Sequence, residues 1–238
     1  MMSLLATGLW PPAYKVKKHR RAKHVKLRVV KPACLEITVP YRFNLHDIPA
    51  LLEEHRAWIT KQLLIRQSQP SDELPTQVVM PSIHETWTIR YMACDRKLEI
   101  IHRPQQEMVL MGYLHDKKKC KEKLIAWVKQ HAHLHLSSQL NKISEKIQLT
   151  YQQVHIRDQR TIWGSCTAKK TIHLNYKLLF LPSHLVTHIM IHELCHTQYL
   201  NHSKHFWALV AQHDPAWQRH RRELREAEQF IPGWIDRD

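Results

Sequence analysis

The sequence of 238 residues lacks the features that mark several classes of protein. Its five cysteines are odd in number and widely spaced and include no CxxC pair, so neither a disulfide framework nor a four-cysteine zinc site is indicated. No apolar stretch approaches the roughly 20 residues that span a bilayer. The short apolar run near the N-terminus is not preceded by positive charge, as it would be in a signal peptide. We therefore expect a soluble, cytoplasmic protein with reduced thiols, no signal peptide and no membrane segment.

The composition is that of a folded protein with an unusual charge. Apolar residues make up 43% of the chain and charged residues 24%, and eight tryptophans and seven tyrosines argue against disorder. The formal net charge is +15 and the isoelectric point is near 9.7. A field of this sign favours polyanionic partners such as nucleic acid or nucleotides. The alternative is a solvated basic surface.

Strand and helix patterns alternate in the N-terminal part of the chain. Alternating residues over 14–39, with a break at Lys31-Pro32, predict a β-hairpin. Apolar residues at helical spacing predict an amphipathic helix over 44–66, and the polar segment 67–77, which contains two prolines, predicts a linker or loop. Further strands are predicted at 78–80, 86–91, 98–101 and 108–111.

A long helix is predicted next, from Lys117 to Leu140. Its histidines His131, His133 and His135 are interpreted as surface residues, because alternate positions of a helix do not face one ion. Strands are then predicted at 150–157 and 171–175, on either side of a WGSC turn at 163–166, and helices at about 184–200, 203–213 and 215–228.

These elements predict an α+β fold without internal repeats. We expect an N-terminal β-rich subdomain with one helix over residues 1–111. Residues 112–238 are expected to form a helical domain with a small sheet, and this domain carries the residues with the strongest functional signal.

That signal is the sequence HELCH at 192–196. His192 and His196 are four residues apart on a predicted helix, so their rings lie about 40° apart around its axis and about 6 Å along it. Both imidazoles can therefore reach one metal ion. Glu193 points to the adjacent sector, where it can take a proton from a water molecule at the ion. This is the HExxH arrangement of zinc hydrolases.

A third ligand is needed to distinguish a metal site from chance, because the chain contains 20 histidines. His202 follows His196 by six residues, and a turn at Asn201 would return its ring toward the ion. Three imidazoles with an open fourth position are typical of catalytic zinc. We therefore predict Zn²⁺ bound by His192, His196 and His202. In the competing interpretation there is no metal site, and these histidines cap helices or pair with carboxylates. If there is a metal site, three imidazoles would also accept nickel, copper or cobalt.

The segments around this motif resemble a known family. RTIWGSC at 160–166, IHLNY at 172–176 and the run over 178–217 that contains HELCH are similar to the YgjP-like metallopeptidase domain family, and more distantly to SprT-like and WLM proteases. The basic segment from Tyr14 and the helix around Trp58 also look like this family, so the resemblance covers about residues 14–225.

The resemblance implies a minimal zincin-type metallopeptidase core in the C-terminal domain. It assigns metal binding to His192, His196 and His202 and catalytic acid/base chemistry to Glu193. The Trp163-Gly164 corner is interpreted as structural, with the large ring against the catalytic helix. A thiolate ligand from Cys166 or Cys195 is an alternative, although three histidines suffice.

Two positions depart from the family's pattern. Ile162 stands where an arginine commonly precedes the tryptophan, and Thr187-His188 replaces an acidic–aromatic pair before the catalytic helix. If the missing arginine contacts substrate, Arg157 and Arg160 are the nearby substitutes.

The functional prediction is a zinc-dependent hydrolase of the metallopeptidase type, acting on a polypeptide. Glu193 would accept a proton from the attacking water and return it to the leaving amine. Tyr199, Asn201 and His205 are the nearest candidates for an oxyanion donor. One alternative is a nucleoside triphosphate pyrophosphohydrolase that applies the same water to a nucleotide.

The second alternative is a nucleic-acid-associated protein with a zinc site. It is suggested by the basic segment 15–28, KVKKHRRAKHVKLR. The structural alternative for this segment is an edge strand that lysine protects from aggregation. Proteolysis and nucleic-acid binding could also coexist, as they do in SprT-like relatives.

Overall fold

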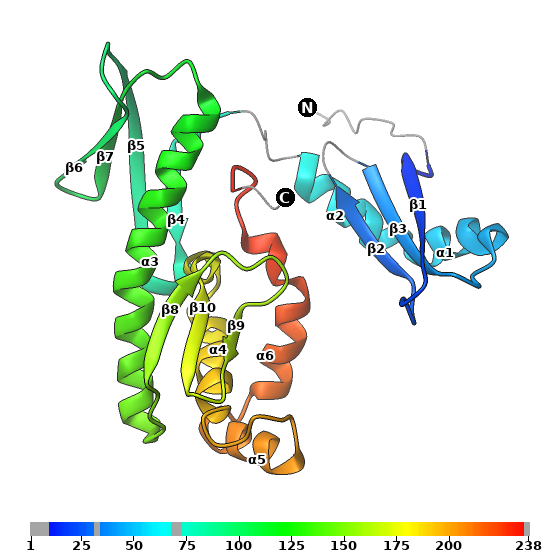
Figure 1. Cartoon of the computed structure of the whole chain (residues 1–238). Helices are drawn as coiled ribbons and strands as arrows, with labels where there is room; N and C mark the ends of the chain where they lie inside the picture. The colour runs from blue at the N-terminus through cyan, green and yellow to red at the C-terminus, as the bar shows by residue number, and fades with distance from the viewer. Residues whose placement is uncertain (1–9, 31–33, 68–72, 236–238) are drawn as a thin grey trace, which may run out of the picture. The chain divides into compact units, whose positions relative to one another are not determined.

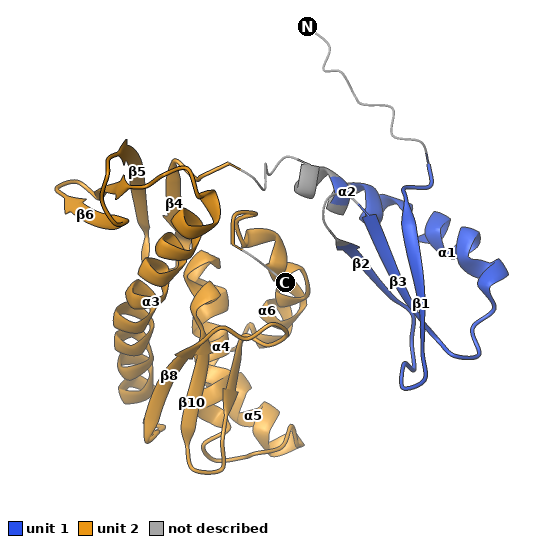
Figure 2. Ribbon diagram, turned by 45° about the horizontal axis from the view of Figure 1, so that its top comes forward, with its two compact units in different colours: residues 1–70 blue, residues 71–238 orange. Residues whose placement is uncertain are grey.

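The computed structural model describes residues 10–30, 34–67 and 73–235. The chain divides into two compact units, residues 1–70 and 71–238 (Figure 2). The division falls inside the expected linker 67–77, of which residues 68–72 lie outside the described part. It places residues 71–111 in the second unit, whereas the sequence-based boundary after residue 111 assigned them to the first.

The first unit begins with a three-stranded sheet in the order β1-β3-β2. Its strands are β1 (Tyr14–His19), β2 (Lys26–Val30) and β3 (Cys34–Pro40). Strands β2 and β3 pair antiparallel, as the hairpin prediction requires, although the break at Lys31-Pro32 lies outside the described residues. Strand β1 instead runs parallel to β3, so the alternation over 14–39 contains a third strand. Along β3, alternate side chains are fully buried: Leu35, Ile37 and Val39.

Two helices follow where the pattern predicted one. A short 3-10 turn η1 (Leu45–Asp47) leads into α1 (Ile48–Glu54) and α2 (Arg56–Gln67), with the interruption at His55. The Asn44 side chain caps the start by accepting a hydrogen bond from the His46 N–H. Ile48, Leu52 and Ile59 bury their side chains in the same core as β3, which makes this unit a sheet covered by helices.

The second unit opens with a four-stranded sheet in the order β4-β5-β7-β6. All four predicted strands are present, as β4 (Gln77–Met80), β5 (Glu85–Ala93), β6 (Glu99–Arg103) and β7 (Glu107–Gly112), with a 3-10 turn η2 (Pro81–Ile83) after β4. Val78, Met80, Met108 and Leu110 belong to the same buried cluster as the helices that follow. This shared core groups the sheet with the C-terminal residues.

Helix α3 (Lys117–Ile147) runs along this core (Figure 1). The Asp116 side chain caps it by accepting from the Lys119 N–H. The interpretation of its three histidines as surface residues is wrong for two of them. His131 and His135 are four residues apart and only 15% and 30% exposed, and they approach one carboxylate. His133 alone is exposed, because its side chain leaves the helix on another face.

A second, smaller sheet has the order β8-β10-β9, from β8 (Gln153–Arg157), β9 (Gly164–Cys166) and β10 (Thr171–Asn175). Strand β10 pairs parallel with β8 and antiparallel with β9. The WGSC segment is therefore largely a strand at the sheet edge, where the sequence predicted a turn. This strand contacts α4, the helix that carries HELCH.

The C-terminal helices are α4 (Ser183–Cys195), α5 (Lys204–His213) and α6 (Trp217–Glu223), with 3-10 segments η3 (Tyr176–Phe180) before them and η4 (Leu224–Phe230) after them. Helix α4 packs against α3, α5, α6 and β9, so it is the centre of this unit (Figure 1). The architecture is α+β, as predicted. In the described part of the chain, none of the helices has the length and apolar character of a membrane span.

Candidate metal centre

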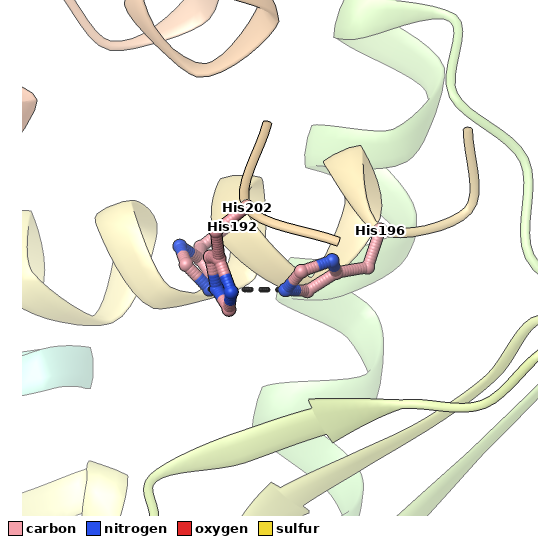
Figure 3. Close-up of side chains that lie close together, drawn as sticks. All are labelled: His192, His196 and His202. Carbon is pink, nitrogen blue, oxygen red and sulfur yellow. Dashed lines mark hydrogen bonds between the residues drawn. The ribbon is translucent and has the colours of Figure 1, made fainter. Parts of the chain in front are cut away.

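Helix α4 and the segment after it bring the three predicted ligands together. His192 lies in the last turn of α4, and His196 follows directly at its C-terminal cap, so both rings project from one face. His202 comes from the segment that leads into α5, where the Ser203 hydroxyl caps the helix by accepting from the Phe206 N–H. Figure 3 shows the three imidazoles pointing toward one another.

The spacing of the ring nitrogens fits a tetrahedral ion. The Nε2 atoms of His196 and His202 each lie 3.2 Å from Nε2 of His192. Two ligand atoms bonded to tetrahedral zinc at about 2.0–2.1 Å are separated by about 3.3 Å. One cation at this point would satisfy the lone pairs of all three rings.

Neighbouring groups fix how these rings are presented. Nδ1 of His196 donates a hydrogen bond to the backbone oxygen of Tyr199 at 2.9 Å, because a carbonyl can only accept. The proton is thereby held on Nδ1 and the Nε2 lone pair is free for a metal. The Phe206 ring stacks on His196 with centroids 4.4 Å apart, and Trp207 stacks on His202 at 5.6 Å. The ligand set is therefore held by packing as well as by hydrogen bonding.

Burial keeps the central ring uncharged. It lowers the pKa of His192 to about 3, with further contributions from the neighbouring His196 and His202. Burial also lowers the pKa of His196. Neutral imidazole is the form that binds a metal ion, so the site is prepared for a ligand role at neutral pH.

Glu193 lies beside this cluster as a buried carboxyl group. It is 5% exposed, and its Oε2 atom has no hydrogen-bond partner among the described residues. Gly164 of β9 packs directly against it, since a Cβ at position 164 would lie 2.8 Å from both Cγ and Oε1 of Glu193. Burial raises the pKa of the Glu193 carboxyl to about 8. An unpartnered carboxyl of this kind suits proton transfer.

A pocket of about 270 Å³ adjoins Glu193. Among its lining residues, Glu193 and Arg221 are the ones with an acidic or strongly basic side chain. The Arg221 guanidinium lies 4.9 Å from the centroid of the Trp207 ring, which itself stacks on Trp217 at 4.5 Å. The lining of this pocket therefore combines an acid/base group with a positioned cation. Its lining also includes Thr161, Ile162, Trp163, Gly164, His188, Ile189, His192, Trp207 and Leu224.

A buried polar network connects the wall of this pocket to α6. Asp214 Oδ2 accepts hydrogen bonds from Nδ1 of His188, at 2.6 Å, and from Nδ1 of His220, at 2.9 Å. Burial acts to raise the pKa of Asp214, but the hydrogen bonds from His220 and His188 outweigh it and lower the pKa. His188 lines the pocket and His220 precedes Arg221, so the network holds α4 and the cation of α6 in place.

Other sequence-based candidates have different surroundings. The thiols of Cys166 and Cys195 are absent from the metal-capable clusters of the described residues, and burial raises their pKa values to about 11 and about 12. Neither is set up as a thiolate. Tyr199, Asn201 and His205 do not line the pocket.

The arginine that Ile162 replaces was expected to have a substitute in Arg157 or Arg160, and the structure differs from this expectation. Arg157 and Arg160 do not line the pocket, and its cation is Arg221 from α6. Sequence reasoning missed Arg221, His188 and Asp214. Arg221 comes from α6 and Asp214 from the C-terminal cap of α5, and only the packing of these helices against α4 brings them to the site. His188 lies one helical turn before His192 on α4, and this spacing is the signal in the sequence that could have placed it near the site.

Comparison with known protein families places the chain in the class of metallopeptidase domains. Residues 23–227, most of its length, match a metallopeptidase domain. That domain is the YgjP-like metallopeptidase domain, and the chain belongs to this family, as the sequence resemblance indicated. Membership supports a metallopeptidase-type function and implies a metal ion. No curated protein and no solved structure matches the chain.

Proposed function

We propose that the chain is a zinc-dependent metallopeptidase, with His192, His196 and His202 as the metal ligands and Glu193 as the catalytic acid/base. The convergence of three Nε2 atoms beside an unpartnered, buried carboxyl group carries this proposal. Three nitrogen donors leave the fourth position of a tetrahedral ion open to water and substrate. Five free cysteines favour a cytoplasmic location.

Glu193 moves the proton in this mechanism. When bound, zinc supplies a Lewis acid that activates water and polarises a scissile carbonyl. A cation at the three histidines would favour the ionised form of Glu193, whose carboxylate would then accept the proton of the attacking water and deliver it to the leaving amine. Gly164 leaves room for the carboxylate at this position, and Tyr199 holds His196 in the tautomer that presents Nε2 to the ion.

The sheet edge next to Glu193 favours a polypeptide as substrate. Strand β9 pairs with β10 on one side and is the end strand of its sheet. An extended peptide can add to such an edge through main-chain hydrogen bonds. Because Gly164 belongs to β9 and contacts Glu193, a peptide paired there would pass beside the acid/base group.

The test combines metal content with hydrolysis. Chelator-treated protein is reloaded with Zn²⁺, and zinc is measured by elemental analysis alongside cleavage of an unfolded protein substrate. We expect His202→Ala to lose the zinc of this site and the cleavage, whereas the exposed neighbour His205→Ala keeps that zinc. Unchanged zinc and cleavage in His202→Ala would refute the three-histidine site.

A phosphoanhydride hydrolase, acting on nucleoside triphosphates, is the second candidate. The observation in its favour is Arg221, a cation in the pocket next to Glu193 that could bind a phosphate group. Pyrophosphate release from nucleotides in the absence of any peptide cleavage, lost in Glu193→Gln, would select this function.

Nucleic-acid binding is a separate proposal for the basic segment of the first unit. All six residues of β1 are exposed, and the strand is an edge of its sheet. Glu36 of β3 is in register with both Lys15 and Arg28, and it is the only acidic side chain among residues 14–40. Binding of nucleic acid through this face would weaken steeply with salt, whereas a flat salt response would leave the lysines a solubilising role.

A further inference from the structure

A second cluster of metal-ligand side chains lies in the 71–238 unit, between α3 and β5. His131 and His135 are one helical turn apart on α3, and their rings lie 4.5 Å apart at an angle of 31°. Both present Nε2 to Glu85, the first residue of β5: His131 Nε2 is 2.8 Å from Oε2 and His135 Nε2 is 3.8 Å from Oε1. Each histidine thus faces a different oxygen of the same carboxylate.

The surroundings hold these three side chains in place. The Trp87 indole Nε1 donates a hydrogen bond to Glu85 Oε2 at 2.8 Å, which orients the carboxylate. The Trp127 ring packs on His131 with centroids 4.8 Å apart, so it continues the stack of the two imidazoles. Such outer contacts are what fix ligand orientation at metal sites in proteins.

A simple ion pair explains the position of His131 but not that of His135. A pair would need only one histidine, and the 3.8 Å contact of His135 is too long for a hydrogen bond. The three ligand atoms all lie within 4.8 Å of one another. The 2.8 Å contact of His131 is with Oε2 and the 3.8 Å contact of His135 is with Oε1, so small side-chain shifts would bring the donors to the roughly 3.3 Å spacing of a tetrahedral ion.

Access is also suitable. The side chains are 15% exposed for His131, 20% for Glu85 and 30% for His135, so the cluster opens to solvent on one side. Two imidazoles and one carboxylate would leave a further coordination position for water. This donor set binds divalent transition-metal ions such as zinc, iron and manganese.

We propose that Glu85, His131 and His135 form a second metal site, which binds a divalent transition-metal ion and links β5 to α3. The site shares no residue with the proposed catalytic centre and does not depend on the proposed function. Its ion joins the start of a strand to the middle of a helix, so its main effect is on stability.

The experiment uses the full chain, stripped with a chelator and dialysed against Zn²⁺ before elemental analysis. We expect two zinc ions per chain in the wild type and one in both His135→Ala and Glu85→Gln. The matched control is His133→Ala, an exposed histidine on the same helix between the two ligands, which should keep two. Far-ultraviolet circular dichroism of each variant establishes that it is folded before its zinc is counted.

The thermal unfolding midpoint gives a second readout that does not involve activity. Zn²⁺ should raise this midpoint in His202→Ala, where the second site is intact, and the rise should disappear when His135→Ala is added. Equal zinc content in the wild type, Glu85→Gln and His135→Ala would overturn the proposal.

The two metal assignments fail in distinguishable ways. A single ion in the wild type that is lost in His202→Ala but kept in His135→Ala overturns the second site and leaves the catalytic site standing. A single ion that is lost in His135→Ala but kept in His202→Ala supports the second site and removes the proposed catalytic one. Two ions lost one at a time support both.

Discussion

Two pairs of histidines in the 71–238 unit share the same helical spacing and differ in their relation to glutamate. On α4, His192 and His196 meet a third histidine, while Glu193 stays buried and unpartnered next to a pocket. On α3, His131 and His135 meet Glu85 itself, whose carboxylate accepts a hydrogen bond from the Trp87 indole and lies 2.8 Å from His131 Nε2.

The difference shows what separates a catalytic site from a structural metal site. A carboxyl group without a partner can exchange a proton with a substrate, whereas one engaged by an indole and an imidazole is fixed. The α4 pair also adjoins a pocket of about 270 Å³, into which a substrate group can enter. We therefore expect chemistry at the first pair and stability from the second.

The largest expected effect comes from exchanging the two glutamates for glutamine. Glu193→Gln should lower peptide cleavage about 10²–10⁴-fold, because general acid–base catalysis contributes that much, and should leave zinc content unchanged. Glu85→Gln should do the reverse, with cleavage retained and one zinc lost. Cleavage rate and zinc per chain, measured on the same samples, check both.

Two outcomes would contradict the assignment of catalysis to the first site and stability to the second. Wild-type cleavage in Glu193→Gln would remove this residue from the mechanism. Loss of cleavage in a folded Glu85→Gln would mean that the α3 cluster takes part in the reaction. Glu122→Gln, at an exposed position of α3, is the neutral control for introducing glutamine.

Gly164→Ala tests whether the position of the Glu193 carboxyl matters as much as its presence. A methyl group at 164 would come 2.8 Å from Cγ and Oε1 of Glu193, so the carboxylate must move. We expect cleavage to fall about 10²-fold, the cost typical of misplacing a catalytic group by about 1 Å, with zinc retained.

The control for this change is Ser165→Ala in the same strand. It adds no atoms next to Glu193 and should cleave at the wild-type rate. If Gly164→Ala is also fully active and folded, the close packing of β9 on Glu193 has no catalytic role.

The ligand pattern on α4 could be predicted from the sequence because helical geometry is local. Two histidines four residues apart on a helix share a face whatever surrounds them, and His202 needed only one turn of chain to reach them. The same rule applied to His131 and His135 should have placed them together. The alternate position of His133 takes it to another face of α3, which leaves His131 and His135 as the pair that shares one.

Features that depend on contacts between distant segments could not be predicted. Gly164 meets Glu193 only because β9 packs against α4, and Asp214 joins His188 only because α5, which Asp214 caps, packs there too. The strands predicted over 78–111 are present, but the sequence did not show which helices share their core. Their alternation shows that one face is buried but not which helix covers it.

The buried network beside the pocket gives the next largest effect, on stability. Asp214→Asn removes the charge that accepts hydrogen bonds from His188 and His220. We expect a loss of about 2 kcal/mol in the free energy of unfolding at pH 7, since a hydrogen bond to a charged group contributes about 1.5–3 kcal/mol. Urea unfolding measures it, with the exposed Asp95→Asn as control.

The pH dependence of this loss has a definite sign. The pKa of Asp214 is lowered in the folded state, so the stabilisation is complete above the ordinary value of 3.8 and disappears as the pH falls through the folded pKa. The difference between wild type and variant should therefore be full at pH 7 and shrink below about pH 4. A difference that stays constant down to pH 3 would exclude the charge of Asp214 as its source.

The smallest expected effect concerns the cation of the pocket and distinguishes among substrates of the first site. Arg221 is exposed and lies over Trp207, so its charge is partly screened by solvent. We expect Arg221→Gln to raise KM about tenfold, or about 1.4 kcal/mol, for peptides with an acidic side chain next to the scissile bond. Neutral peptides should be unaffected, as should all substrates with Arg222→Gln, which changes the next residue outside the pocket lining. An equal rise in KM for acidic and neutral peptides would mean that Arg221 supports the wall of the pocket and does not interact with the charge of the substrate.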